Sequence, residues 1–103
     1  MPPGILAMLV LRVLRSGTLH GYAIAQRIRI LSDSVLAAEE GSLYPTLQRM
    51  LLEGWVTSGP GVSETGRRVR FYTLTRSGLK QLKREMAEYE EATDAIQTIL
   101  RTA

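Results

Sequence analysis

The spacing of hydrophobic and polar residues along the chain predicts mainly helical structure. An almost uninterrupted apolar stretch predicts a first helix over residues 4–15 that must be largely covered by the rest of the protein. A second helix is expected over residues 19–31, because Ile24 and Ile28 fall on one face while charged and amide side chains turn away. Residues 32–39 are predicted to form a loop with one turn.

A third helix is predicted from about Ser42 to Glu53, with Gly54 as its stop signal. Its apolar residues recur with the spacing of one helix face: Leu43, Leu47, Met50 and Leu51. Pro45 lies inside this pattern, and proline is tolerated in the first turn of a helix, where its missing N–H has no partner. The helix is therefore expected to begin close to Ser42, with free backbone N–H groups that point outward and suit a phosphate.

A β-hairpin is predicted after the third helix. Residues 55–58 are a short strand candidate, and residues 67–75 are a second one, rich in β-branched and aromatic side chains. The stretch GPGVSETG between them indicates a long hairpin tip. By the strand period of two, Arg68 and Arg70 share one side, which Tyr72 continues toward the body of the domain.

A long final helix is predicted to open at residues 75–78, with Thr75 or Ser77 as its cap. Apolar positions follow along it at intervals of three and four, a heptad seam in which Thr93 is the polar member. At 1.5 Å per residue this helix would be roughly 37 Å long, more than the preceding domain needs. The surplus predicts pairing with a second copy of the chain. The predicted dimerisation residues are Leu82, Met86, Tyr89, Thr93, Ile96 and Leu100.

Composition narrows the function classes. The chain has 103 residues, 45% hydrophobic and 22% charged, which is typical of one soluble domain. Because it has no cysteine and one histidine, disulfides, thiolate catalysis and zinc sites built from Cys or His clusters are excluded. No phosphate-loop or dinucleotide-binding glycine pattern occurs, so we expect neither an enzyme nor a cofactor. The longest apolar run has seven residues, so we expect a cytoplasmic protein without a membrane span.

The net charge of +3 is concentrated in one part of the chain. Residues 1–75 carry eight arginines and no lysine against five acids, whereas the charges of residues 76–103 cancel. Arginines repeated on one side of a strand favour an anionic partner. The alternative is that the polar helix face and the strand charges only keep the protein soluble.

Three helices followed by an arginine-bearing hairpin are the layout of a winged helix-turn-helix. The expected fold is thus mainly α with a two-stranded hairpin, divided into a DNA-binding domain (residues 1–75) and a dimerisation helix (residues 76–103). In such a fold the third helix enters the major groove of DNA. The predicted DNA contacts are Ser42, Tyr44, Pro45, Thr46, Gln48, Arg49, Arg67, Arg68, Arg70 and Tyr22. Because the chain has no asparagine, a bidentate contact to adenine would fall to Gln48.

Several aromatic residues allow two interpretations. Tyr22 either reaches the DNA backbone or fills the edge of the core, and His20 either caps the second helix or contacts a phosphate. Tyr89 either belongs to the dimer core or provides a platform for a ligand. Trp55 is expected in the core at the base of the hairpin or facing a dimer partner.

Three segments resemble, in order and spacing, the motifs of the PadR family of bacterial transcriptional regulators: LHGYAIAQRI (19–28), EEGSLYPTLQRMLLEGWV (39–56) and RRVRFYTLT (67–75). The resemblance implies a winged helix-turn-helix homodimer, usually a repressor, joined through the C-terminal helix with help from the first. It also implies release from DNA by small aromatic ligands in some members. A twofold dimer would place its third helices about 34 Å apart on a palindromic operator. The alternative function is a winged-helix adaptor that binds another protein, which would not need the arginine cluster.

Overall fold

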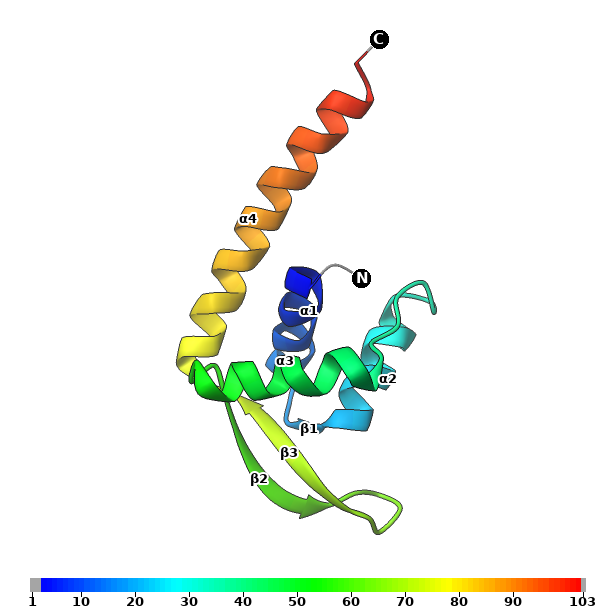
Figure 1. Cartoon of the computed structure of the whole chain (residues 1–103), viewed down its shortest axis with the longest axis vertical. Coiled ribbons are helices and arrows are strands. Elements are labelled where there is room, and N and C mark those ends of the chain that lie inside the picture. Colours follow the sequence, from blue (N-terminus) through cyan, green and yellow to red (C-terminus); the bar gives the residue numbers. More distant parts are fainter. Residues whose placement is uncertain (1–2, 103) are drawn as a thin grey trace.

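The computed structural model describes residues 3–102, and Figure 1 shows how their helices and strands are arranged. In chain order the elements are α1 (Pro3–Arg15), β1 (Leu19–His20), α2 (Gly21–Leu31), α3 (Glu40–Leu52), β2 (Val56–Val62), β3 (Arg68–Leu74) and α4 (Arg76–Leu100). The predicted fold class, a winged helix-turn-helix with a long final helix, is confirmed. We call the β2–β3 hairpin the wing. Within residues 3–102, no helix is both long and apolar enough to cross a bilayer.

Helix α1 forms the centre of the hydrophobic core, as its apolar sequence predicts. Val10 and Leu11 have no exposed surface, and α2, α3, β3 and α4 all pack against this helix. Every other element contributes a smaller apolar face, because each of them borders solvent on its other side. The other elements contribute these buried side chains: Ile24, Ile28, Leu43, Leu47, Met50, Val56, Tyr72 and Leu82.

The sheet has three antiparallel strands in the order β1-β3-β2, one more than the hairpin that the sequence predicts. The additional strand is the residue pair Leu19–His20, which lies opposite Tyr72 and Phe71 of β3. The prediction that helix α2 begins at residue 19 is therefore wrong by two residues. A two-residue strand shows no periodicity, so only its pairing with β3 identifies it. This pairing ties the start of α2 directly to the wing.

The wing is longer, and its tip shorter, than predicted. Strand β2 continues through the glycine-rich stretch to Val62, where it pairs with Arg68, so the turn comprises residues 63–67. Proline is tolerated within β2 because β2 is an edge strand. Gly61 is required for a different reason: a Cβ atom here would collide with the ring of Phe71, which lies across this position. The prediction that residues 59–62 belong to the tip is therefore wrong, because they form an edge strand, whereas residues 63–66 do lie in the turn, with Gly66 at a φ of 82°.

Helix α3 begins at Glu40, two residues before the predicted start. Its N-cap is Glu39, whose side chain makes no capping hydrogen bond. Pro45 therefore lies beyond the first turn, and the prediction that places it there is wrong. Pro45 and Gly41 are both exposed, so the carbonyl group that proline cannot hydrogen-bond faces solvent. The predicted stop is confirmed, because Gly54 follows the helix with a φ of 75°.

Thr75 is the cap of helix α4, which resolves the two predicted alternatives. Its hydroxyl oxygen accepts a hydrogen bond from the Gly78 N–H at 3.0 Å and donates one to the Gly54 carbonyl at 2.7 Å. Ser77 instead lies inside the first turn and is exposed. The Thr75 hydroxyl thus joins the end of α3 to the start of α4.

Replacing Thr75 with valine is expected to lower the free energy of unfolding by about 1–2 kcal/mol, because both hydrogen bonds are lost while the side-chain shape is kept. Urea unfolding at a fixed protein concentration measures this change. The control is Ser77→Ala, which should change stability by less than about 0.5 kcal/mol. Equal effects of the two substitutions would show that Thr75 is not the cap.

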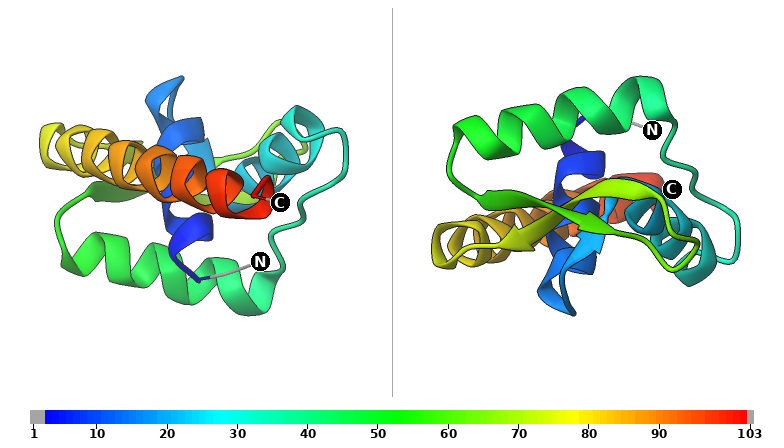
Figure 2. Two further views of the ribbon diagram at one scale, coloured as in Figure 1. Left: turned by 90° about the horizontal axis from the view of Figure 1, so that it is seen from above. Right: turned by 90° about the horizontal axis from the view of Figure 1, so that it is seen from below.

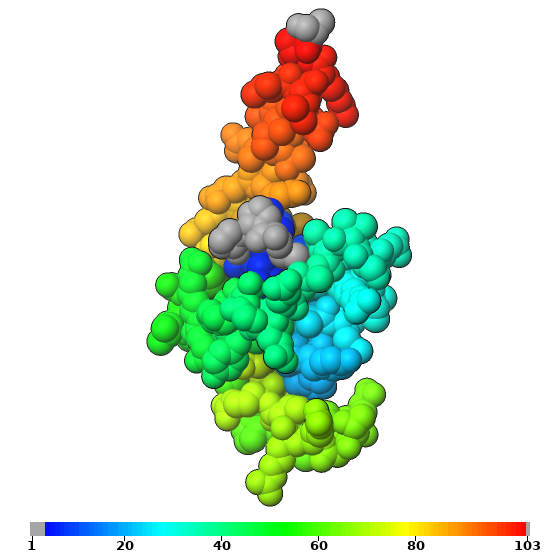
Figure 3. All heavy atoms as spheres, turned by 45° about the vertical axis from the view of Figure 1, so that its right-hand side comes forward, coloured from blue at the N-terminus to red at the C-terminus, as the bar shows by residue number. Residues whose placement is uncertain are grey.

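The outer half of α4 extends away from the body of the protein (Figures 1 and 3). The protein consequently measures 56 Å along its longest axis and 29 and 22 Å along the others. Leu82 has no exposed surface, and Met86 is half-buried against the core. Farther out, Ile96 and Leu100 are 54% and 72% exposed. The seam therefore serves two purposes: Leu82 belongs to the core of its own chain, whereas the outer residues are uncovered.

Candidate nucleic-acid interface

Helix α3 and the wing lie at the end of the body opposite the free end of α4 (Figure 1). Seen from below, α3 runs along one side of the wing, and the start of α2 approaches the wing near its tip (Figure 2, right). At least Tyr44 of α3 and Arg70 of β3 share one face of the protein, because both line one groove.

Most of the predicted contact residues of α3 are exposed. Leu43, Leu47 and Met50 are buried, and the side chains on the other faces of the helix are accessible: Ser42, Tyr44, Pro45, Gln48 and Arg49. Thr46 is half-buried, and its hydroxyl donates to the carbonyl of Ser42 at 2.8 Å. Tyr44 and Gln48 lie four residues apart and so form one stripe along the helix.

Arg49 contacts groups at the far end of α3. Its guanidinium lies 5.7 Å from the ring centroid of Trp55, a cation–π geometry. Burial raises the pKa of the Glu85 carboxyl on α4, and the charge of Arg49 partly offsets this increase. Trp55 is half-buried against the core at the base of the wing, as predicted. The structure therefore places Arg49 beside Trp55 and close enough to Glu85 of α4 to affect its pKa.

The arginines of the wing are exposed. Arg67 lies in the turn, and Arg68 and Arg70 lie on β3, separated by the half-buried Val69. One guanidinium nitrogen of Arg70 donates to the hydroxyl of Ser58 on β2 at 3.0 Å. This hydrogen bond orients Arg70 across the wing. Arg68 makes no such contact with the described residues 3–102 and remains accessible to solvent.

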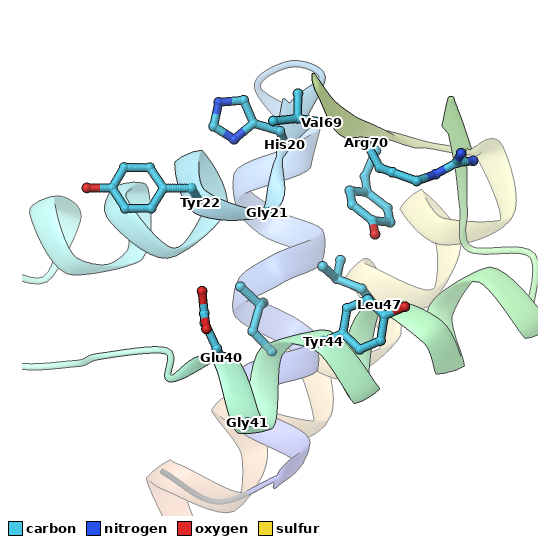
Figure 4. Close-up of a pocket in the computed structure, with 11 residues that line it drawn as sticks. His20, Gly21, Tyr22, Glu40, Gly41, Tyr44, Leu47, Val69 and Arg70 are labelled. Carbon is cyan, nitrogen blue, oxygen red and sulfur yellow. The ribbon is translucent and has the colours of Figure 1, made fainter. Parts of the chain in front are cut away.

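A groove of about 640 Å³ lies between the start of α2, the first half of α3 and strand β3 (Figure 4). It brings together three of the predicted residues: Tyr22, Tyr44 and Arg70. Ser42, Thr46, Gln48 and Arg49 of α3 do not line it. The groove could not be predicted from the sequence, because the residues that form it come together only through the pairing of β1 with β3.

His20 and Tyr22 sit side by side at one edge of the groove. The Nδ1 atom of His20 accepts a hydrogen bond from the Ala23 N–H at 3.2 Å, which confirms the interpretation of His20 as the cap of α2. The rings of His20 and Tyr22 are nearly parallel, with centroids 6.5 Å apart. Tyr22 is 70% exposed, so its interpretation as a core residue is wrong.

Tyr72 forms part of the floor of the groove, and the sequence analysis did not assign it to the site. It lies on the central strand and pairs with Leu19 on one side and Ser58 on the other. Burial is the main reason that its pKa is raised; the neighbouring Tyr44 phenol adds to the increase and Arg70 opposes it. Its hydroxyl is therefore protonated at neutral pH and can act as a hydrogen-bond donor.

Comparison with known proteins places this geometry in a family. Residues 10–84 match the sequence profile of the Transcriptional regulator PadR-like family. Over 78 residues, 76% of the chain, the sequence is 31% identical to the negative transcriptional regulator PadR of Bacillus subtilis (strain 168). The chain spans 43% of that relative, less than half of its length.

Solved structures show the same fold. A transcriptional regulator from Clostridium thermocellum superposes with a TM-score of 0.87 at 30% identity, over 95% of both chains. Bacillus subtilis PadR in complex with operator DNA superposes with a TM-score of 0.70 at 29% identity, over 80% of this chain and 47% of that one. The family consists of transcriptional regulators and not of enzymes. The chain therefore belongs to the Transcriptional regulator PadR-like family.

Proposed function

We propose that the protein is a homodimeric repressor that binds a palindromic operator through α3 and the wing and acts in the cytoplasm. The observation that carries this proposal is that Arg70 of the wing and Tyr44 of α3 line one groove, while the wing lies at the end opposite the free part of α4. A protein of this shape can pair through α4 and still present both α3 helices to one side of a DNA duplex. The operator complex of the Bacillus subtilis relative supports the same use of the fold.

Different residues have different roles in the proposed complex. Tyr44 and Gln48 contact base edges from α3, because both are exposed on its stripe beside the wing. Arginine side chains of the wing neutralise phosphates, and Tyr22 adds a backbone contact from α2. Ser42, Pro45 and Thr46 border the DNA on the other flank of α3. Arg49 contributes at most a backbone contact at the end of the helix, because it packs on Trp55.

The proposed dimer interface uses the outer part of α4. Met86, Tyr89, Thr93, Ile96 and Leu100 form it, and Leu82 is left out because it is buried within its own chain. A twofold axis through this seam would set the two α3 helices about 34 Å apart, one turn of DNA. The family resemblance adds release by a small aromatic ligand. Such a ligand can act only if it binds the DNA-free form more tightly than the DNA-bound form.

Selection of DNA fragments tests the proposal. Purified protein is incubated with fragments of the genome that encodes it, and the bound fragments are sequenced. We expect a few promoter fragments with a palindrome whose half-sites are one helical turn apart. If the folded, dimeric protein enriches none of them at moderate salt, the repressor proposal is wrong, and a role as a protein adaptor becomes the better explanation.

A charge placed on the seam is expected to break the dimer. Ile96→Asp should convert the protein to a monomer at micromolar concentration, because an unpaired carboxylate would be buried in an apolar interface. Sedimentation velocity measures the change. The control is Thr98→Asp, which adds the same charge on the opposite, exposed face of α4 and should leave the dimer intact. A dimer that survives Ile96→Asp would contradict the proposed interface.

A further inference from the structure

We propose that the groove between α2, α3 and the wing is a binding site for a small aromatic cation, and that this ligand and DNA exclude each other. The binding part of this inference concerns the DNA-free protein and stands by itself. Its regulatory part rests on the proposed function, because it requires that the same face binds DNA.

The groove has the size and the floor of a small-molecule site. Its volume of about 640 Å³ falls within the range of roughly 300–1,000 Å³ that is typical of ligand pockets. Leu43, Leu47 and Tyr72 form a buried and mainly apolar floor, with exposed fractions of 5% or less. Exposed side chains of Tyr22, Tyr44 and Arg70 belong to its lining, so the groove is accessible from solvent. A flat apolar molecule could therefore enter it and cover the floor.

Two aromatic side chains border the groove without any role in the core. Tyr22 extends from α2 and Tyr44 from α3, on different sides of the groove (Figure 4). They are 70% and 62% exposed, although large aromatic side chains usually bury much of their surface. Aromatic rings attract both flat apolar molecules and cations placed over their faces. The walls of the groove thus suit an aromatic ligand that carries a positive charge.

The charges at the groove favour a cation over an anion. The carboxylate of Glu40 points from α3 into the gap toward α2 (Figure 4). No basic side chain among residues 3–102 forms an ion pair with it. Arg70 is the basic residue of the lining, but it points away from Glu40 and already donates to Ser58. Glu39 adds a second carboxylate at the same helix end, which outweighs the partial positive charge of the helix terminus.

A ligand in this groove would block DNA directly. Tyr22, Tyr44 and Arg70 line the groove and are also proposed DNA contacts. A bound cation would cover these side chains and hold the Glu40 carboxylate in an ion pair. Because the ligand binds only the DNA-free form, it competes with the operator. Once the ligand concentration exceeds the Kd of the ligand, the apparent affinity for the operator falls in proportion to the ligand concentration. This mechanism needs no change in the spacing of the dimer.

Calorimetric titration of the DNA-free protein tests the site. The probes are 2-naphthylmethylamine, which is cationic at neutral pH, and 2-naphthoate, an anion with the same ring system. We expect saturable binding of the amine and at least about tenfold weaker binding of the acid. Equal binding of both probes, or no saturable heat with the amine, would overturn the proposal.

Two neighbouring carboxylates provide a matched pair of variants. Glu40→Gln should weaken binding of the amine by about tenfold or more, because it removes the charge that faces the groove. Glu39→Gln removes the same charge at the same helix end, but Glu39 does not line the groove, so its effect should stay below about threefold. Equal effects of the two variants would show that general electrostatic attraction, and not the groove, binds the amine.

A competition experiment separates this inference from the proposed function. 2-Naphthylmethylamine is added to the complex of the protein with a selected DNA fragment. The control is cyclohexylmethylamine, which carries the same charge and screens phosphates equally but lacks an aromatic ring. Release by the naphthyl compound alone supports the regulatory part, and equal release by both amines contradicts it. A protein that binds the amine but enriches no DNA fragment would overturn the proposed function and leave the binding site standing.

Discussion

Arg68→Ala combined with Arg70→Ala is expected to lower the affinity for a selected operator fragment by more than about a hundredfold at roughly 0.15 M salt. Both side chains are exposed on β3, on the side of the strand that Tyr72 continues into the groove. A dimer would lose four guanidinium groups from its two wings. Each lost phosphate contact also lowers the slope of log affinity against log salt by about one unit, so we expect a decrease of about four units.

Fluorescence anisotropy with a labelled fragment, repeated at several salt concentrations, measures both quantities. The control variant is Arg84→Ala combined with Arg101→Ala, which removes the same charge from an exposed position on α4 and from its exposed C-cap. It should lower the affinity by less than about tenfold, because long-range attraction alone is changed. An unchanged salt slope in the wing variant would show that the wing does not contact phosphates.

Gly78→Ala is expected to lower the free energy of unfolding by about 3 kcal/mol. Gly78 is buried in the first turn of α4, and an added Cβ atom would collide with the carbonyl oxygen of Trp55 and lie 2.7 Å from a methyl carbon of Leu74. The carbonyl cannot easily move away, because it accepts a hydrogen bond from the Thr75 N–H at 3.0 Å. Added volume at this junction must therefore separate α4 from the base of the wing.

The control for this substitution is Gly41→Ala. Gly41 is also helical, but an added Cβ atom would meet no heavy atom within 4 Å. Alanine should stabilise this position by about 0.5–1 kcal/mol, because it loses less conformational freedom on folding. Urea unfolding at one protein concentration compares the two variants. A change of the same sign and size in both would mean that helix propensity, and not packing, determines the effect at Gly78.

The helices were largely predictable from the sequence, because their apolar residues repeat with the period of a single buried face. The wrong predictions concern proline and glycine, because each of these residues is found both at turns or helix ends and inside regular elements. The rule that proline marks the first turn fails for Pro45, which lies deeper in α3 and is tolerated there because Gly41, whose carbonyl it cannot hydrogen-bond, is exposed. Glycines near residue 60 predict a turn, but Gly61 lies within β2, where it makes room for the Phe71 ring.

The individual contact residues of the candidate site could be predicted from the sequence, but their arrangement around a groove could not. Exposed residues of α3 and the wing arginines follow from periodicity and charge, so both sets could be predicted. The groove depends on a strand of two residues, because the pairing of His20 with Phe71 brings α2 next to the wing. The position of Arg49 on the polar face of α3 predicts a DNA contact. Its cation–π contact with Trp55 could not be predicted from periodicity, because it depends on the tertiary structure.

In the proposed dimer, the outer half of α4 would make folding depend on the amount of protein present. Beyond Met86 this segment has little support from its own chain, with Ile96, Ile99 and Leu100 all more than half exposed. An unsupported helix of this length is marginally stable in water. If α4 pairs with a second copy as proposed, helix formation there and dimerisation would be one equilibrium, governed by mass action. At low expression a cell would hold chains with a frayed terminus that proteases can reach, so assembly would also set the lifetime of the regulator.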